Sequence, residues 1–374
     1  MLIKRTIQKY IESCLFKEKI IVIYGARQVG KTTLAKEIEK KYKEKSLYLN
    51  CDEPDVREAL YNRTSTELKS FLGNKQFIIV DEAQRVRNIG LTLKLIVDNF
   101  PKIQIVATGS SSFELSNEIS EPLTGRKYEF FLYPFSLEEL AQVYSKIEIK
   151  RLLKDRMIFG LYPEIVKNRP RAWMNLKSIA KSYLYKDVIR FQEIKDSEIL
   201  KKLLQALALQ IGNEVSYNEL ANVVGIDKKT VAKYIQILEK AFIIFRLNPF
   251  SRNLRTELRK LRKIYFYDNG VRNAIINNSN QLDLRQDVGA LWENFMITER
   301  IKYNSNHQND LNSYFWRTQH KQEIDYIEDI GGKLFGYEIK WSSKKREEPK
   351  LWKKTYNNAE FKIINKENYL DFVT

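Results

Sequence analysis

The chain has 374 residues, of which 43% are hydrophobic and 12% aromatic. This length exceeds one compact core of roughly 100–200 residues, so several domains are expected, and the composition excludes a disordered or fibrous chain. No apolar run approaches the ~18 residues of a membrane-spanning helix, so we expect a cytoplasmic protein without membrane contact. Two cysteines and two histidines exclude a disulfide framework and a cysteine-based zinc site, which leaves oxygen ligands for any metal.

The positive charge is concentrated in the middle third of the chain. Residues 141–263 hold 26 Lys and Arg against 12 Asp and Glu, whereas residues 1–140 hold 22 against 19 and residues 264–374 hold 16 against 16. A local surplus favours a polyanion-binding surface, with nucleic acid ahead of membrane because no basic amphipathic helix with a clean apolar face is evident. The alternative is a lysine-rich background composition, which predicts no such localisation.

The first 140 residues alternate apolar runs with amphipathic stretches. Runs typical of buried strands span residues 20–24, 46–50, 77–80 and 103–108. Helical patterns span residues 56–61, 65–72 and 90–100. This alternation predicts a parallel sheet with crossover helices, and the change to nearly continuous helix after it places a first boundary near residue 140.

A phosphate-binding loop follows the first predicted strand. The segment from Gly25 to Thr32 fits G-x-x-x-x-G-K-[ST] and leads into a helical pattern. Glycines let backbone N–H groups approach phosphate oxygens, and a helix start favours anions. We expect Lys31 at the β- and γ-phosphates and the Thr32 hydroxyl on Mg²⁺. The residues expected to bind ATP are Gly25, Ala26, Arg27, Gln28, Val29, Gly30, Lys31, Thr32 and Thr33.

The strand predicted at residues 77–80 ends in two acids. Asp81 is expected to hold Mg²⁺, and Glu82 to act as the general base that polarises the attacking water. The alternative is that both acids cap the strand and solvate a loop. The strand at residues 103–108 leads into a serine-rich turn, where Ser110 is expected to face the γ-phosphate; an ordinary turn is the alternative.

Residues 215–241 have the spacing of a helix-turn-helix. Ser216 with Glu219 predicts a capping box, Gly225 the turn, and Asp227 the start of a second helix. The expected buried stripe is Leu220, Val224, Ile226, Val231, Ile235 and Leu238. The expected exposed face is Lys228, Lys229, Thr230, Lys233 and Tyr234.

An apolar strand at residues 242–247 and a basic run after it complete the pattern of a winged helix. We expect phosphate contacts to dominate any DNA binding, because few side chains are available to read bases. The expected DNA-binding residues are Lys228, Lys229, Lys233, Arg252, Arg255 and Arg259. A module that only packs between its neighbours is the alternative.

The last third is strand-rich around a predicted helix at residues 289–303. Glu293 lies on that helix, Asp325 on a strand at 323–327, and Glu338 and Lys340 on one face of a strand at 334–341. This arrangement resembles the PD-(D/E)XK nuclease core. There Asp325 and Glu338 would bind Mg²⁺, Lys340 would orient water or stabilise phosphate charge, and Glu293 would add a ligand. A retained but silent scaffold is the alternative.

Motifs along the whole chain resemble those of bacterial and archaeal AAA+ P-loop ATPases with a C-terminal domain of unknown function, DUF4143. They are GARQVGKT at 25–32, VDEAQ at 80–84, TGSS at 108–111, LTGR at 123–126, LYPFSLEE at 132–139, GLYPE at 160–164, YFYDNG at 265–270 and EIK at 338–340. The resemblance implies that Ser110 is a sensor residue and that Arg126 is an arginine finger acting on a neighbour's nucleotide, hence self-association. It also agrees with a winged helix.

The sequence therefore predicts an α/β protein with an AAA+ P-loop core at 1–140, a helical lid at 141–195, a winged helix-turn-helix at 196–262 and a PD-(D/E)XK nuclease-like (restriction-endonuclease-like) domain at 263–374. The predicted function is an enzyme that hydrolyses ATP to ADP and phosphate with Mg²⁺ and acts on, or is regulated by, DNA, with nuclease activity left open. The alternative is a slow nucleotide-gated switch whose C-terminal half is a silent scaffold that binds DNA or protein.

Overall fold

The computed structural model describes residues 2–109, 119, 121–182, 197–251, 261–318, 322–342 and 347–374. Internal contacts divide the chain into two units. The P-loop unit comprises residues 4–133 and 240–242, and the C-terminal unit comprises residues 1–3, 134–239 and 243–374. The predicted residues Ser110, Arg252, Arg255 and Arg259 lie outside the described residues. The finer division at residues 195 and 262 stays a prediction.

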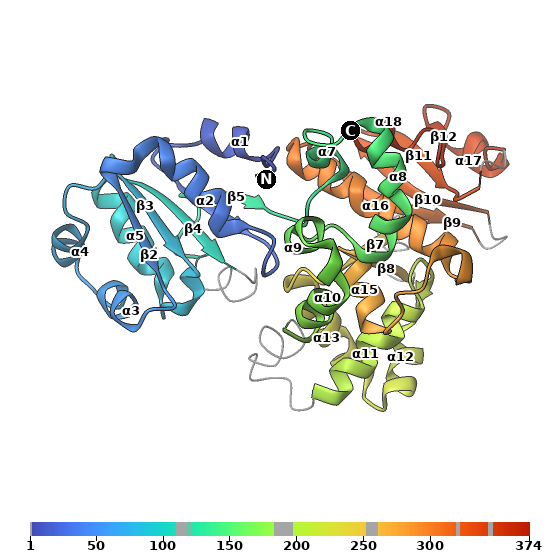
Figure 1. Cartoon of the computed structure of the whole chain (residues 1–374), viewed down its shortest axis with the longest axis horizontal. Helices are drawn as coiled ribbons and strands as arrows, with labels where there is room; N and C mark the ends of the chain where they lie inside the picture. Colours follow the sequence, from blue (N-terminus) through green and yellow to red (C-terminus); the bar gives the residue numbers. More distant parts are fainter. Residues whose placement is uncertain are drawn as a thin grey trace. The chain divides into compact units, whose positions relative to one another are not determined.

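The P-loop unit is a five-stranded parallel sheet with helices around it (Figure 1). Its strands are β1 (Ile20–Tyr24), β2 (Ser46–Asn50), β3 (Phe77–Asp81), β4 (Gln104–Gly109) and β5 (Lys127–Phe131), in the order β2-β3-β4-β1-β5. Its helices are α1 (Gln8–Ser13), α2 (Lys31–Glu39), α3 (Pro54–Leu60), α4 (Ser65–Leu72) and α5 (Ile89–Asn99), with short 3₁₀ turns at Lys40–Lys45 and Ala83–Arg85. The predicted parallel α/β architecture is confirmed.

Burial explains which of these strands the sequence could predict. Every residue of β1, β3 and β4 is buried, so these three central strands are almost uninterrupted apolar runs. Strand β5 lies at the edge of the sheet, and only Phe130 in it is buried. Its sequence lacks the apolar run of a central strand, and it was not predicted, whereas β2 at the other edge was predicted although only Leu49 in it is buried.

The C-terminal unit begins with helices and continues into a second sheet. Its helices are α7 (Leu137–Leu140), α8 (Lys146–Phe159), α9 (Pro163–Lys167), α10 (Ala172–Ser182), α11 (Ser197–Leu209), α12 (Tyr217–Val224), α13 (Lys228–Lys240), α15 (Asn269–Ile275), α16 (Val288–Asn306), α17 (Lys350–Thr355) and α18 (Leu370–Val373). Short 3₁₀ turns lie at Arg169–Arg171 and Leu282–Leu284. Helix α16 packs against the sheet and carries Leu291, Trp292 and Phe295 into the main apolar core.

The second sheet has seven strands of mixed direction. They are β6 (Glu214–Val215), β7 (Ile244–Pro249), β8 (Arg262–Phe266), β9 (Asn312–Arg317), β10 (Glu323–Ile330), β11 (Lys333–Ile339) and β12 (Glu360–Ile364), in the order β12-β11-β10-β9-β7-β8-β6. The strand expected in the wing, β7, pairs with β8 and also with β9, at Asn248 opposite Tyr314. The wing strand and the nuclease-like strands therefore belong to one continuous sheet.

Candidate nucleotide site and C-terminal carboxylate cluster

The phosphate-binding loop leaves the carboxyl end of the buried strand β1 and enters α2 at Lys31. Gly25 lies against the backbone of Leu132, and a Cβ atom there would come within 2.2 Å of the Leu132 carbonyl oxygen. Gly30 has φ +99°, a conformation that side chains disfavour. The two glycines of the motif are therefore required by the local backbone as well as by the approach of phosphates.

Lys31 is buried inside this loop. Its Nζ donates to the carbonyl oxygens of Gly25 at 2.8 Å and Ala26 at 2.9 Å, so the ammonium lies within the turn that the loop makes. Only 5% of Lys31 is exposed. A buried ammonium beside the amide groups at a helix start is suited to a polyanion such as a triphosphate.

Asp81 is the centre of a hydrogen-bond cluster at the carboxyl edge of the sheet. It accepts from the Thr32 hydroxyl at 2.9 and 3.1 Å, from the Tyr48 hydroxyl at 2.6 Å, and from the Thr108 hydroxyl. These donors come from α2, β2 and β4, so three elements converge on the end of β3. Tyr48 and Thr108 were not predicted, because the interactions that identify them join residues 33 and 27 positions apart.

The donor set at this edge fits Mg²⁺. The Thr32 hydroxyl and the Asp81 carboxylate are adjacent oxygen ligands, the kind that Mg²⁺ prefers, and bound phosphates supply further oxygens in P-loop proteins. Burial and the Asp81 carboxylate raise the pKa of the Cys51 thiol to about 12 and also raise the pKa of Tyr48.

Glu82 adopts a left-handed backbone conformation, with φ +53° and ψ +43°. Its N–H donates to the Thr108 hydroxyl at 3.2 Å, and its carboxylate accepts from the Gln84 amide at 2.6 Å. Non-glycine residues in this region cost roughly 1–3 kcal/mol and are concentrated at functional sites. Thr108 thus joins the backbone of Glu82 to the carboxylate of Asp81.

Arg126 lies at the opposite edge of the sheet from the phosphate-binding loop. Its carbonyl accepts from the N–H of Ile20 at the start of β1, and its guanidinium pairs with Asp98 at 2.6 Å on the surface. The loop begins at the other end of β1, about 13 Å away at ~3.3 Å per residue. Arg126 is therefore not placed to act on a nucleotide bound by its own loop.

The helix-turn-helix has the expected local structure. The Ser216 hydroxyl accepts from the N–H of Glu219, whose own carboxylate accepts from Gln210, so half of the predicted capping box is present. Gly225 has φ +80° between α12 and α13, and the Asp227 carboxylate accepts from the N–H of Thr230 at 2.9 Å.

The two faces of the helix-turn-helix differ from prediction at three positions, one of which is Thr230, expected to be exposed but half-buried. The expected stripe is buried except for Ile226, which is half-buried. Lys228, Lys229 and Lys233 are exposed, as predicted. Tyr234 was expected on that face but is buried, with 5% exposed. Its ring lies on the core side of α13, so it is not available to meet a ligand on the lysine face.

The four residues of the predicted nuclease centre lie in one cluster. The Lys340 ammonium is 2.9 Å from Glu338 Oε1 and 3.3 Å from Asp325 Oδ2, and Asp325 Oδ2 also accepts from the N–H of Ile339 at 2.8 Å. Glu293 joins the cluster through Lys263, whose Nζ is 3.1 Å from Glu293 Oε1. The sequence prediction missed Lys263, which appeared there only as the end of a basic run.

The cluster does not fit a divalent metal, because Lys263 already lies among its carboxylates. Lys263 is 2% exposed, and its Nζ is also 2.5 Å from Glu323 Oε1 and 3.9 Å from Asp325 Oδ1. Within the described parts of the chain, no three His, Cys, Asp or Glu side chains are grouped so as to hold a metal ion. Burial, and next the Asp325 carboxylate, raise the pKa of Glu293.

Two motifs to which the sequence assigned no role, at residues 160–164 and 265–270, meet in a buried joint. The Asp268 carboxylate accepts from the N–H groups of Leu161 at 2.7 Å and Val271 at 3.1 Å. Gly160 has φ +70°, and a Cβ atom on it would lie 2.0 Å from Asp268 Oδ1. A Cβ atom on Gly270 would lie 2.2 Å from the Phe159 carbonyl oxygen. The motifs are therefore accounted for by packing between α8 and α15.

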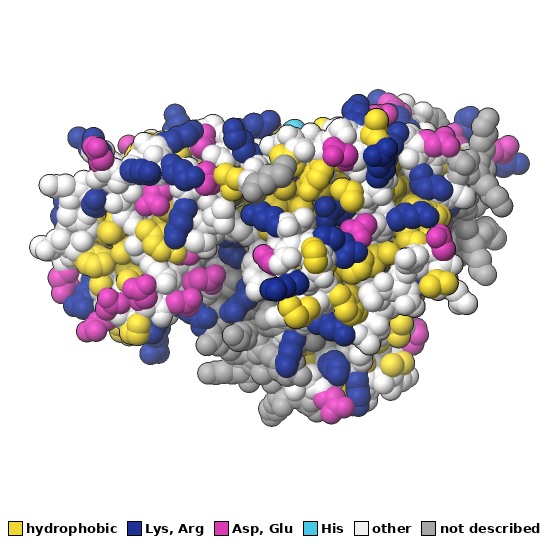
Figure 2. All heavy atoms as spheres, viewed as in Figure 1, with side chains coloured by type: hydrophobic (Ala, Val, Ile, Leu, Met, Phe, Trp, Pro, Cys, Tyr) yellow, Lys and Arg dark blue, Asp and Glu magenta, His cyan; other side chains and the backbone are white. Residues whose placement is uncertain are grey.

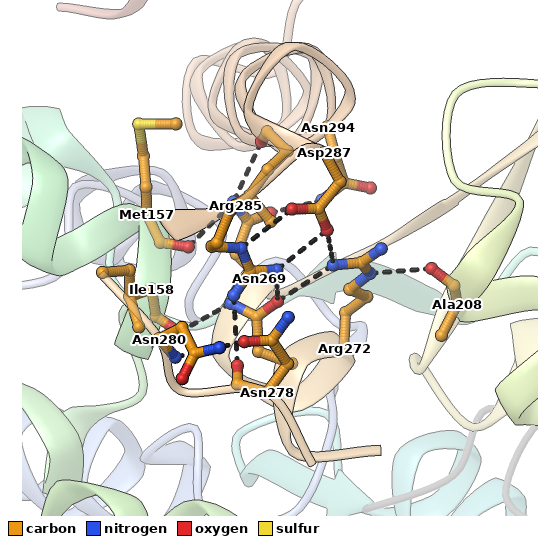
Figure 3. A network of polar contacts seen from close by, with 12 residues as sticks. Met157, Ile158, Ala208, Asn269, Arg272, Asn278, Asn280, Arg285, Asp287 and Asn294 are labelled. Atoms are coloured by element: carbon orange, nitrogen blue, oxygen red, sulfur yellow. Dashed lines mark hydrogen bonds and ion pairs between the residues drawn. The ribbon is translucent and has the colours of Figure 1, made fainter. Parts of the chain in front are cut away.

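Side chains of α15 also satisfy the end of α8. Asn269 and Asn273 donate to the carbonyl oxygens of Met157 and Ile158, which are in the last turn of α8 and have no partner within the helix (Figure 3). Arg272 reaches the Ala208 carbonyl on α11 at 2.8 Å and pairs with Asp287 at 2.5 Å (Figure 3). The network thus connects α8, α11 and α15 and has a structural role.

The topology and the loop define a P-loop nucleotide-binding domain: a parallel sheet in the order β2-β3-β4-β1-β5, with a glycine-rich loop after β1 and an acid after β3. Comparison with protein families agrees. Residues 17–141 match the AAA domain, residues 150–282 a domain of unknown function (DUF8612), and residues 288–368 a domain of unknown function (DUF4143). The chain thus contains a region that matches the AAA domain and a C-terminal region that matches DUF4143, as its motifs predicted.

Relatives of similar length occur in bacteria and archaea. An uncharacterised protein of Methanocaldococcus jannaschii is 28% identical over 394 residues, covering 96% of this chain and 84% of that protein. An uncharacterised Mycobacterium tuberculosis protein is 26% identical over 341 residues, covering 89% and 73%. Among solved structures, the Thermotoga maritima RuvB Holliday junction branch migration motor gives a TM-score of 0.33 at 16% identity, covering 64% of this chain and 88% of that one. No described helix is long and apolar enough to span a membrane.

Proposed function

We propose that the chain binds ATP with Mg²⁺ and hydrolyses it at the carboxyl edge of the β1–β5 sheet. The observation that carries this proposal is the cluster in which the Thr32 and Thr108 hydroxyls both donate to Asp81, with the Glu82 N–H bonded to Thr108. It joins the phosphate-binding loop to the two strand ends that face it. An arrangement held this tightly before substrate arrives is preorganised for catalysis.

Each residue has a distinct role in the proposed reaction. Lys31 and the loop N–H groups bind the phosphates and neutralise the charge that develops on them. Thr32 and Asp81 would hold Mg²⁺, which supplies charge neutralisation at the β- and γ-phosphates. The Glu82 carboxylate takes a proton from water as the water oxygen bonds to the γ-phosphorus and the bond to the β–γ bridging oxygen breaks. The products are ADP and phosphate.

Nucleotide binding tests the first step. Lys31→Ala removes the buried ammonium and should abolish binding of a fluorescent ATP analogue. Lys40→Ala is the matched control, because Lys40 follows the same helix but is exposed and pairs only with Glu37. We expect Lys40→Ala to bind as the parent does. Equal affinity of Lys31→Ala and parent would contradict the site.

We further propose that Arg126 completes the site of a neighbouring copy. Arg126 is half-buried and lies at the edge of the sheet away from its own loop, a position that supports contact with another subunit's nucleotide. A positive group there would stabilise charge in the transition state without binding the ground state. Turnover per subunit should then rise with protein concentration.

DNA is the proposed partner of the C-terminal unit. Lys228 and Lys229 are exposed in the first turn of α13, Lys233 is exposed one turn later, and basic side chains are frequent on the face of the molecule in Figure 2. Lysines contact phosphates and carry little sequence information, so binding should be strong at low salt and weak in sequence preference. The burial of Tyr234 also favours backbone contacts over base stacking.

A salt titration distinguishes this proposal from a module that only packs. Log affinity for duplex DNA should fall against log salt with a slope near −0.9 per phosphate contact. Lys229→Glu with Lys233→Glu should flatten that slope by roughly two units. The control with the same charge change is Lys201→Glu with Lys202→Glu on the exposed face of α11, which should leave it unchanged. A parent slope near zero would refute DNA binding by this surface.

For the C-terminal carboxylates we propose the silent scaffold in place of a nuclease. Lys263 lies where a catalytic cation would have to bind, and a nuclease of this class needs that cation to activate water. The chain would then couple an ATPase to a DNA-binding scaffold. A slow nucleotide-gated switch differs only in rate, and DNA-stimulated turnover would exclude it.

A further inference from the structure

Lys263 has the surroundings of a bound cation. It lies on β8, and its side chain is 2% exposed. Three carboxylates on other elements surround its Nζ: Glu323 at 2.5 Å, Glu293 at 3.1 Å and Asp325 at 3.9 Å. The ring of Phe315 lies 5.5 Å from the same atom. The ammonium therefore meets acids from α16 and β10, and its position is enclosed by protein.

Each carboxylate of the cluster is paired with a cationic side chain. Lys340 approaches from the other side and bonds Asp325 Oδ2 and Glu338 Oε1, while Arg317 lies 3.8 Å from Glu323 and 2.9 Å from Glu214. Buried carboxylates are stable only when paired and hydrogen-bonded. Here those requirements are met by ammonium and guanidinium groups.

A divalent ion would compete directly with this ammonium. Mg²⁺ needs carboxylate oxygens at about 2.0–2.1 Å in octahedral geometry, and Nζ within hydrogen-bond distance of the same oxygens excludes that arrangement. Burial alone would lower the pKa of Lys263, but the three surrounding carboxylates raise it instead.

We propose that Lys263 is the resident cation of the carboxylate cluster, so that the cluster binds no divalent metal and instead ties β8 to β10 and α16. The inference does not depend on ATP hydrolysis. It predicts that this lysine has a structural role, and that removal of its charge opens a divalent-cation site formed by Glu293, Glu323 and Asp325.

Mn²⁺ binding to the full chain tests the proposal, with Mn²⁺ chosen because carboxylate oxygens suit it and its paramagnetism reports binding directly. All proteins carry Asp81→Asn, which removes the carboxylate ligand at the nucleotide site. The parent should show no saturable Mn²⁺ binding at this cluster. Lys263→Met should gain one site with a Kd of about 0.1–1 mM, the range of weak carboxylate sites. Lys333→Met is the control, because Lys333 makes a surface pair with Glu360 on the same sheet.

Two results would overturn the proposal. One is Mn²⁺ binding by the parent that Asp325→Asn removes, since the ammonium would then not exclude metal. The other is a folded Lys263→Met that binds no more Mn²⁺ than Lys333→Met. If Lys263→Met does not fold, the double variant with Glu293→Gln decides: a recovered melting transition supports a charge-neutralising Lys263, and no recovery counts against it.

Discussion

Thr108 provides the sharpest test of how the nucleotide site is held together. Its hydroxyl donates to Asp81 and accepts from the N–H of Glu82 at 3.2 Å, and the residue is fully buried. Thr108→Val keeps the shape but removes both interactions. A hydrogen bond to a charged group contributes about 1.5–3 kcal/mol, and an unpaired buried N–H costs about 1–3 kcal/mol. Allowing for partial relaxation, we expect the free energy of unfolding to fall by about 2–4 kcal/mol.

The same change should slow hydrolysis. Thr108 aligns Asp81 and Glu82. If its loss removes about 2 kcal/mol of transition-state stabilisation, turnover falls roughly 30-fold. Thr92→Val is the matched control: Thr92 is buried in the same unit and donates only to the Leu60 carbonyl, at 2.8 Å. It should cost about 1 kcal/mol of stability and leave turnover unchanged.

Urea denaturation and steady-state phosphate release, measured on the same preparations, separate the two effects. Turnover of Thr108→Val equal to that of Thr92→Val would show that Thr108 only stabilises the fold. The proposed link between the ends of β3 and β4 and catalysis would then be wrong.

Three further predictions concern the rest of the chain. Arg126→Ala should lower turnover by ~10³-fold with little change in ATP affinity, and a parental rate at all protein concentrations would contradict a shared site. Gly160→Ala should destabilise the C-terminal unit, since its Cβ would meet Asp268, whereas Gly289→Ala, with no atom within 4 Å, should not; equal melting temperatures would contradict the joint. Burial would raise the pKa of Asp287, but hydrogen bonds from two arginines lower it to about 2, so Asp287→Asn should cost about 1–2 kcal/mol after solvent screening. That cost should be complete above pH ~4 and vanish as pH falls toward 2, and a cost independent of pH between 6 and 3 would count against it.

The sequence predicted that the loop and the two acids lie close together, because each is a contiguous pattern. The loop from Gly25 to Thr32, and Asp81 with Glu82, are local patterns attached to buried strands, and both lie at the same sheet edge in the structure. Thr108 was not predicted, because the sequence does not show which side chain of the strand at 104–109 faces Asp81. That choice depends on the register between β3 and β4.

The C-terminal cluster shows the limit of pattern reasoning more clearly. Glu293, Asp325, Glu338 and Lys340 were predicted to meet, and they do. The role of Lys263 depends on β8 joining the same sheet, a pairing of strands far apart in the chain that periodicity does not reveal. The count of Lys and Arg in residues 141–263 also does not reveal the role of Lys263, because a buried lysine and an exposed lysine add the same charge to that count.

Single-turnover hydrolysis by Glu82→Gln tests the central claim most directly. The glutamine is of similar size and can still hydrogen-bond but cannot accept the proton of the attacking water. With Lys31 and the loop intact, the variant should bind ATP as tightly as the parent. It should retain that ATP unhydrolysed, with the rate of phosphate formation reduced roughly 10²–10⁴-fold. Phosphate formation at the parental rate would show that Glu82 is not the base, and that hydrolysis does not occur by the proposed mechanism.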